Sequence, residues 1–180
     1  DHRVLKACRL VHVRCCHSIR RGSVKRPGPP VHDDLVRREF RAEAPNRLWL
    51  TDISEHWAGD SKLYLCAVKD VFSNRIVGYS LNRTMTSQLA VDALQMAVAR
   101  RGGTTNVRGC CVHSDRGSQF GSRRFLETLR VHGLVGSMGR VGAAGDNAAM
   151  ESFFALLQKN VLNRRRWSSF DQLRLSLIHI

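Results

Sequence analysis

Three carboxylates, Asp52, Asp115 and Glu151, occur where they could share one metal-ion site. Asp52 ends a short apolar run, Asp115 follows another, and Glu151 lies near the start of a stretch with helical character. Asp115 and Glu151 are separated by 35 residues, 116–150. Carboxylate oxygens are the protein ligands that Mg²⁺ prefers. Two such ions, roughly 3.5–4 Å apart, catalyse phosphoryl transfer, so this set indicates phosphoryl chemistry on nucleic acid.

Each carboxylate also has an ordinary structural explanation. Asp52 could be a strand-end residue in water, and Asp115 a loop aspartate beside Arg116. Glu151 could simply favour the dipole of a helix whose first turn it occupies. The metal interpretation is favoured because one mixed sheet and its last helix would bring all three together.

Three further residues compete with this triad or support it. Asp70 follows an apolar run just before Ser73-Asn74, so we interpret it as turn chemistry and not as a ligand. Asp146 competes with Glu151, but helix capping explains it better. His113 is either a hydrogen-bond partner of the metal ligands or a histidine of the core, and both alternatives remain open.

Composition points to an anionic partner. Among 180 residues, 29 Lys and Arg against 15 Asp and Glu give a net charge of +14. Such an excess indicates nucleic acid first and an anionic membrane surface second. Neither a run of 18 apolar residues nor a signal peptide is visible, and two adjacent cysteine pairs indicate reduced thiols. We therefore predict a cytoplasmic protein with no membrane partner.

Residues 1–42 form a basic amino-terminal segment that contains a Pro/Gly linker at 27–30. The basic part is either an arm lying on phosphates or the solvated end of an upstream domain, and the two are compatible. Five potential zinc ligands occur there: Cys8, His12, Cys15, Cys16 and His17. Structural zinc needs a second, separated ligand pair, which is missing, so we predict no zinc site.

The remaining pattern predicts elements in the order βββαβαβα. Apolar runs at 48–53, 63–68 and 76–81 predict three antiparallel strands. Two further strands are expected at 109–114 and 134–138. Helices are expected from a cap at Thr86 or Ser87 to Gly102, from a cap at Ser122 through Arg130, and over 148–162 with Asp146 or Asn147 as cap. We predict an α/β fold: a mixed five-stranded sheet, three antiparallel strands then two parallel, with helices on both faces. The Gly- and Ala-rich stretch 139–148 should be mobile.

Four stretches carry a resemblance to a known family: 45–53, 70–78, 113–120 and 145–160. Over roughly residues 40–167 the chain resembles the integrase-type (DDE) core of bacterial insertion-sequence transposases, as the second-reading-frame product. The Asp, Asp-35-Glu spacing is shared with retroviral integrases. The resemblance implies a ribonuclease-H-like fold in which the catalytic triad Asp52, Asp115 and Glu151 binds two Mg²⁺ or Mn²⁺ ions. It also implies DNA strand cleavage by water and strand transfer by a DNA 3′-hydroxyl during transposition.

The resemblance implies DNA as partner, both as element ends and as target, and a homo-oligomer assembled on DNA at the bacterial nucleoid. The helix that carries the glutamate contacts the DNA end in this superfamily. Lys159, eight residues after Glu151, is therefore a DNA-contact candidate. Asn147, Arg140 and Arg116 are further candidates. The helix-turn-helix that such elements use is missing from this sequence, so we expect a first-reading-frame product or fusion to supply it.

These observations divide the chain into the basic segment 1–42, a catalytic core at 43–165 and a truncated carboxyl-terminal segment at 166–180. Residues 175–180 match one translation of a transposon-end adapter used in sequencing libraries, so we expect native sequence to stop near Arg174. The alternative is a genuine short helix. Its apolar face would consist of Trp167, Phe170, Leu173 and Leu177.

Two other functions stay open. A ribonuclease-H-like nuclease would share the fold, but such enzymes usually place an aspartate on the last helix and add a fourth acid. A catalytically inactive DNA-binding fragment could inhibit full-length transposase. A metal-dependent nicking assay distinguishes this fragment from an enzyme.

Overall fold

The computed structural model describes residues 31–58, 61–139 and 147–178. The amino-terminal arm, the zinc candidates, Arg140 and most of the stretch expected to be mobile lie outside the described residues.

The elements are β1 (Leu48–Ala58), β2 (Ser61–Asp70), β3 (Ile76–Asn82), α2 (Ser87–Arg100), α3 (Thr104–Val107), β4 (Cys111–Ser114), α4 (Arg123–Val131), β5 (Val135–Met138), α5 (Ala148–Asn160), the 3₁₀ turn η1 (Leu162–Arg164) and α6 (Phe170–Ile178). The predicted order is confirmed, with α3, η1 and α6 added to it.

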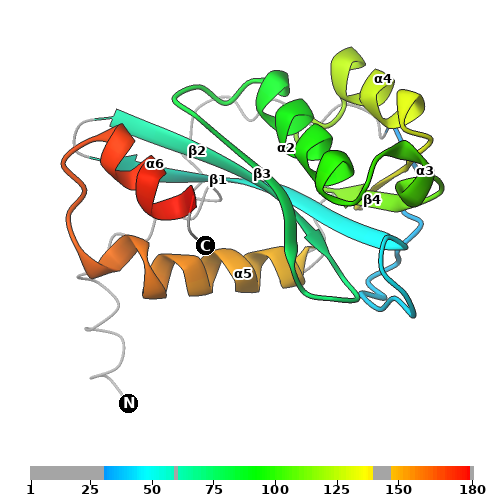
Figure 1. The fold of residues 1–180 in the computed structure, drawn as a ribbon, viewed down its shortest axis with the longest axis horizontal. Coiled ribbons are helices and arrows are strands. Elements are labelled where there is room, and N and C mark those ends of the chain that lie inside the picture. The colour runs from blue at the N-terminus through cyan, green and yellow to red at the C-terminus, as the bar shows by residue number, and fades with distance from the viewer. Residues whose placement is uncertain (1–30, 59–60, 140–146, 179–180) are drawn as a thin grey trace, which may run out of the picture.

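One mixed sheet organises these elements, with its strands in the order β3-β2-β1-β4-β5 (Figure 1). β2 pairs antiparallel with both β1 and β3, whereas β4 pairs parallel with both β1 and β5. The predicted three antiparallel strands followed by two parallel ones are therefore confirmed. The β1–β2 hairpin is longer than predicted, because its backbone pairing continues past Ile53 into Ser54, Glu55 and His56, beyond the apolar run.

Helices cover both faces of the sheet, with α2 and α4 on one side and α5 and α6 on the other (Figure 1). Alternation along β1 supplies both cores, because successive side chains of a strand point to opposite faces. Trp49 and Ile53 pack in the cluster that includes α2. Leu48 and Leu50 pack in another cluster with Met150 of α5.

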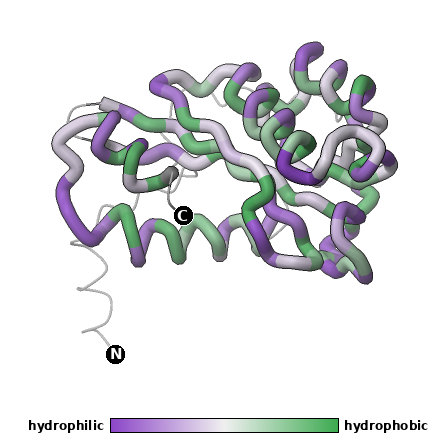
Figure 2. Tube along the Cα trace, viewed as in Figure 1, coloured by the Kyte–Doolittle hydropathy of each residue, from purple (hydrophilic) through white to green (hydrophobic). Residues whose placement is uncertain are grey.

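The carboxyl-terminal helix α6 packs on the α5 side of the sheet. Its Leu173 and Leu177 are buried with Leu63 and Leu65 of β2. This packing agrees with the short-helix alternative for residues 170–178, while the adapter origin of 175–180 stays a prediction. Figure 2 shows α5 as a helix in which hydrophobic residues predominate. None of the helices within the described ranges is both long and apolar enough to cross a membrane.

The segment 31–47 precedes β1, and its residues 33–35 lie at the outer edge of β5. The backbone N–H of Met138 donates to the carbonyl oxygen of Asp33 at 3.3 Å. The backbone N–H of Leu35 donates to Ser137 Oγ at 3.0 Å. This segment therefore covers part of the outer edge of β5, the edge that does not pair with β4.

Gly78 determines how closely α2 approaches β3. A Cβ atom at this position would overlap the carbonyl oxygen of Ala93 and lie 2.6 Å from the backbone nitrogen of Ala97. We predict that Gly78→Ala lowers the free energy of unfolding by about 1–3 kcal/mol, because the helix backbone must move away. Urea unfolding measures this, with Ser80→Ala on the same strand as a control of smaller effect. A Gly78→Ala variant as stable as the wild type would contradict the close approach.

Candidate active site

Asp52 and Asp115 come from neighbouring strands at one level of the sheet. The parallel register of β1 and β4 sets Leu50 opposite His113. Asp52 lies two residues beyond Leu50, and Asp115 lies two residues beyond His113, directly after β4 ends. Paired strands lie about 5 Å apart, so the register brings the two aspartates to adjacent positions.

Glu151 approaches them from the helix layer. It occupies the first turn of α5, where it is exposed and where a negative side chain favours the helix dipole. α5 packs on the face of β1 that carries Leu50. Asp52 lies on the same face, because residues two apart in a strand point the same way.

The Asp52 carboxylate interacts electrostatically with both other acids. Burial raises the pKa of Asp52 most, the charge of Asp115 raises it further, and Glu151 makes a smaller contribution in the same direction. The backbone N–H of Ile53, which donates to Asp52 Oδ1 at 2.7 Å, opposes them. The resulting pKa is about 7, against an ordinary value of 3.8. Asp115 and Glu151 thus both lie within electrostatic reach of Asp52.

The oxygen atoms of these three carboxylates are suitable ligands for a divalent cation. In this structure, however, the carboxylates are not close enough together to share one. Within the described ranges, no group of three or more His, Cys, Asp or Glu side chains is close enough to hold a metal ion. Asp115 Oδ1 instead accepts a hydrogen bond from the backbone N–H of Gly117 at 2.9 Å. All three acids offer hard oxygen ligands, and a cation would relieve the repulsion that raises the pKa of Asp52.

Asp70, the rival ligand, is a structural residue. Its buried carboxylate accepts hydrogen bonds from the backbone N–H of Asn46 and from the backbone N–H and hydroxyl of Ser73, at 3.0, 3.0 and 2.5 Å. Arg101 Nη2 lies 3.1 Å from its Oδ2. Burial raises the pKa of Asp70, but these hydrogen bonds and the Arg101 charge lower it more, so the net pKa is lowered. The interpretation as turn chemistry is confirmed.

His113 is buried beneath the site. Its Nδ1 lies 2.9 Å from Ser137 Oγ on β5, and its ring contacts Phe40 edge to face with centroids 6.2 Å apart. These contacts favour the core-histidine alternative. Its role as a hydrogen-bond partner of the carboxylates stays a prediction.

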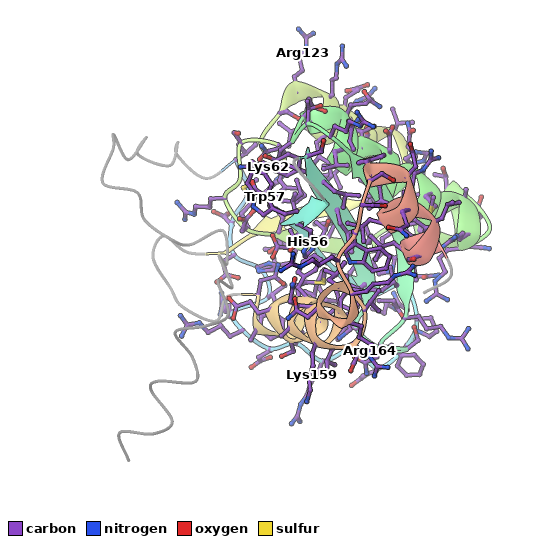
Figure 3. The ribbon with its side chains drawn as sticks, turned by 90° about the vertical axis from the view of Figure 1, so that its left-hand side faces the viewer. His56, Trp57, Lys62, Arg123, Lys159 and Arg164 are labelled. Atoms are coloured by element: carbon purple, nitrogen blue, oxygen red, sulfur yellow. The ribbon has the colours of Figure 1, made fainter. Side chains whose placement is uncertain are left out.

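The predicted DNA contacts occupy different surroundings. Lys159 is exposed in the last turn of α5 and projects outward in Figure 3. Arg116 Nε donates to the carbonyl oxygen of Gly139 at 2.8 Å. Asn147 is buried, and its Nδ2 donates to the carbonyl oxygen of Thr51. As DNA contacts all three stay predictions, as does Arg140, which lies outside the described ranges.

His56 was missed by the sequence analysis because the apolar run ends at Ile53. The hairpin continues, so Asp52, Ser54 and His56 share the face of β1 that meets α5. His56 Nδ1 lies 3.1 Å from Gln158 Oε1, and Figure 3 shows His56 between the hairpin and α5. Period-two alternation continued past residue 53 would have placed His56 on this face, although it would not have identified Gln158 as its partner.

Comparisons with known proteins identify relatives of this chain. The family described as Integrase core domain matches residues 42–144. Transposase InsF for insertion sequence IS3A of Escherichia coli (strain K12) is 38% identical over 157 residues, which are 87% of this chain and 54% of that protein. A transposase-like protein of Haemophilus influenzae is 37% identical over 143 residues, which are 79% of this chain and 64% of that protein. The chain therefore spans about half to two thirds of the length of these relatives.

Solved structures show the same fold at low sequence identity. The HTLV-2 integrase catalytic core domain, solved in complex with magnesium, aligns with a TM-score of 0.57 at 20% identity, over 76% of this chain and 87% of that one. The catalytic domain of the Mos1 mariner transposase aligns with a TM-score of 0.60 at 16% identity, over 74% and 69%. These likenesses confirm the ribonuclease-H-like fold.

Asp70 can be distinguished from a metal ligand by mutation. We predict that Asp70→Asn lowers the free energy of unfolding by about 3 kcal/mol, because the change removes the charge that Arg101 pairs with. Mn²⁺ affinity, measured by calorimetry, should stay unchanged in the folded variant. Lost Mn²⁺ binding with unchanged stability would make Asp70 a ligand after all.

His56 should make the fold sensitive to mild acid. Burial lowers the pKa of His56 to about 4, against 6.5 ordinarily, although Gln158 and Glu55 oppose the change. Between these pH values the unfolded chain takes up a proton that the folded protein does not. The contribution of His56 to stability should therefore fall by up to roughly 3 kcal/mol as pH drops from 6.5 to 4, while the raised pKa of Asp52 acts in the opposite direction. Urea unfolding at several pH values measures the slope. Relative to His56→Gln, the wild type should lose stability as pH falls, because Asp52 affects both proteins alike. A difference between the two that stays constant with pH would contradict the prediction.

Proposed function

Because the chain belongs to the Integrase core domain family, shared by insertion-sequence transposases, we propose that it carries out DNA strand cleavage and strand transfer in transposition. Asp52, Asp115 and Glu151 are its catalytic residues and the ligands of two Mg²⁺ or Mn²⁺ ions. When bound, the ions activate the attacking oxygen and stabilise the leaving oxygen. The observation that carries the proposal is the parallel register of β1 and β4, which brings Asp52 and Asp115 to adjacent positions on the sheet, together with Glu151 in the first turn of α5, the helix that packs on the same face of β1.

DNA is the proposed partner, as element ends and as target. The net charge of +14 supports phosphate binding. Lys159 is exposed eight residues along the helix from Glu151, so a strand that reaches the carboxylates can continue along α5 to it. Such an enzyme would act at the bacterial nucleoid and would obtain end recognition from a helix-turn-helix product or fusion.

Assembly of several copies on DNA is part of the proposal. The solved HTLV-2 core is described in dimeric and trimeric forms, and another similar structure is a simian T-cell lymphotropic virus intasome. The intasome chain aligns with 98% of this chain at 18% identity, with a TM-score of 0.61. These neighbours support an oligomer without fixing the number of copies.

The test separates catalysis from DNA binding. We predict that Glu151→Gln lowers Mn²⁺-dependent nicking of a DNA duplex by more than about 100-fold, because loss of a ligand should exceed the 10–100-fold effect of outer residues. DNA affinity should hold, since no basic contact is removed. Glu127→Gln is the matched control, because Glu127 is an exposed acid of α4 paired with Arg130. Equal nicking by Glu151→Gln and wild type would overturn the proposed role of Glu151, and wild type that binds DNA without nicking would favour an inactive fragment.

A further inference from the structure

Asn147 occupies the amino-terminal cap of α5 without capping it. Its backbone carbonyl accepts the N–H groups of Met150 and Glu151 at 2.9 and 3.0 Å, as the first residue of a helix should. An asparagine here usually turns its side-chain oxygen back to the helix, yet this side chain makes no cap hydrogen bond. Its Nδ2 donates instead to the carbonyl oxygen of Thr51 on β1, at 3.2 Å.

This one residue joins the neighbours of two carboxylates. Thr51 directly precedes Asp52 in β1, and the N–H of Glu151 is bonded to the Asn147 carbonyl. The path from one carboxylate residue to the other therefore contains two hydrogen bonds and no flexible side chain other than that of Asn147. A rotation of the first turn of α5 would break the bond to Thr51.

The arrangement forgoes local stability. Asn147 is only 7% exposed, and its Oδ1 has no hydrogen-bond partner among the described residues. A cap bond is given up, and a buried acceptor has no partner within the part of the chain that the structure describes. Both are unfavourable to folding. Departures of this kind from local rules are concentrated at functional sites.

A second polar contact holds the other end of α5. His56 Nδ1 and Gln158 Oε1 are 3.1 Å apart, also between β1 and α5. Gln158 lies seven residues beyond Glu151, near the end of the helix. The two contacts anchor the same helix to the same strand, but only the Asn147 contact adjoins the carboxylates.

We propose that Asn147 is a positioning residue, which fixes the first turn of α5 on β1 and so holds Glu151 level with Asp52 for divalent-cation binding. This inference rests on the proposed function. Burial of Asn147 favours this role over the direct DNA contact predicted from the sequence, because a phosphate could reach the amide only if α5 moved.

The test measures Mn²⁺ binding by calorimetry on the whole chain, without DNA and without turnover. Asn147→Asp can cap α5 but cannot donate to Thr51, so we expect Mn²⁺ affinity to fall tenfold or more. An added negative charge near the site would by itself strengthen cation binding, so charge cannot produce this loss. Asn147→Ala should bind equally weakly.

Gln158→Ala is the matched control, because it removes the distant contact between the same helix and strand. It should lower the thermal midpoint while leaving Mn²⁺ affinity within about twofold of wild type. Circular dichroism selects a temperature at which every variant is folded. Wild-type affinity in Asn147→Asp overturns the inference, and so does an equal loss in Gln158→Ala, which would make any loosening of α5 sufficient.

Asp115→Asn separates this inference from the function on which it rests. If Asp115→Asn loses Mn²⁺ binding while Asn147→Asp keeps it, the carboxylate site stands and only the positioning role fails. If wild type binds no Mn²⁺, or Asp115→Asn binds it normally, the proposed site and the positioning role fail together. DNA affinity that falls in the neutral variant Asn147→Ala with unchanged Mn²⁺ affinity would restore the DNA-contact role.

Discussion

The parallel register between β1 and β4 is the constraint on which the site depends. It sets Leu50 opposite His113, and from this pair follow the levels of Asp52 and Asp115. A slip of one residue would turn Asp52 to the α2 face, because side chains alternate along a strand. The apolar neighbours prevent such a slip: Trp49 is fully buried with the α2 cluster and Leu50 with the α5 cluster.

Electrostatic repulsion at the site is balanced by packing and polar anchoring elsewhere. The first turn of α5 brings Glu151 toward Asp52, whose negative charge it repels, and this repulsion acts to push the helix away. Met150 and Leu157, buried on the same helix, oppose this with apolar contacts. The polar contacts to β1 add direction to that packing, since hydrogen bonds fix an orientation that apolar burial leaves free.

The sequence was sufficient for the sheet and most helices, because these follow from apolar periodicity and from turn residues. It also identified Asp70 as a turn residue, since Ser73 follows at the spacing of a local hydrogen bond. It did not reveal α3, a four-residue helix with too few positions to show a period. Nor could it reveal what Asn147 and His56 contact. Both partners are about one hundred residues away along the chain, and such pairings depend on tertiary packing, which local patterns do not encode.

The segment 31–47 has a consequence for how copies of this chain can associate. An uncovered edge strand offers unpaired N–H and carbonyl groups to any other extended chain, and this is a common route to aggregation. At β5 the backbone N–H of Met138 already donates to the carbonyl oxygen of Asp33, and the hydroxyl oxygen of Ser137 accepts a hydrogen bond from the backbone N–H of Leu35. Strand addition at β5 is therefore hindered, so a contact between copies at this edge would involve side-chain surfaces and would not extend the sheet.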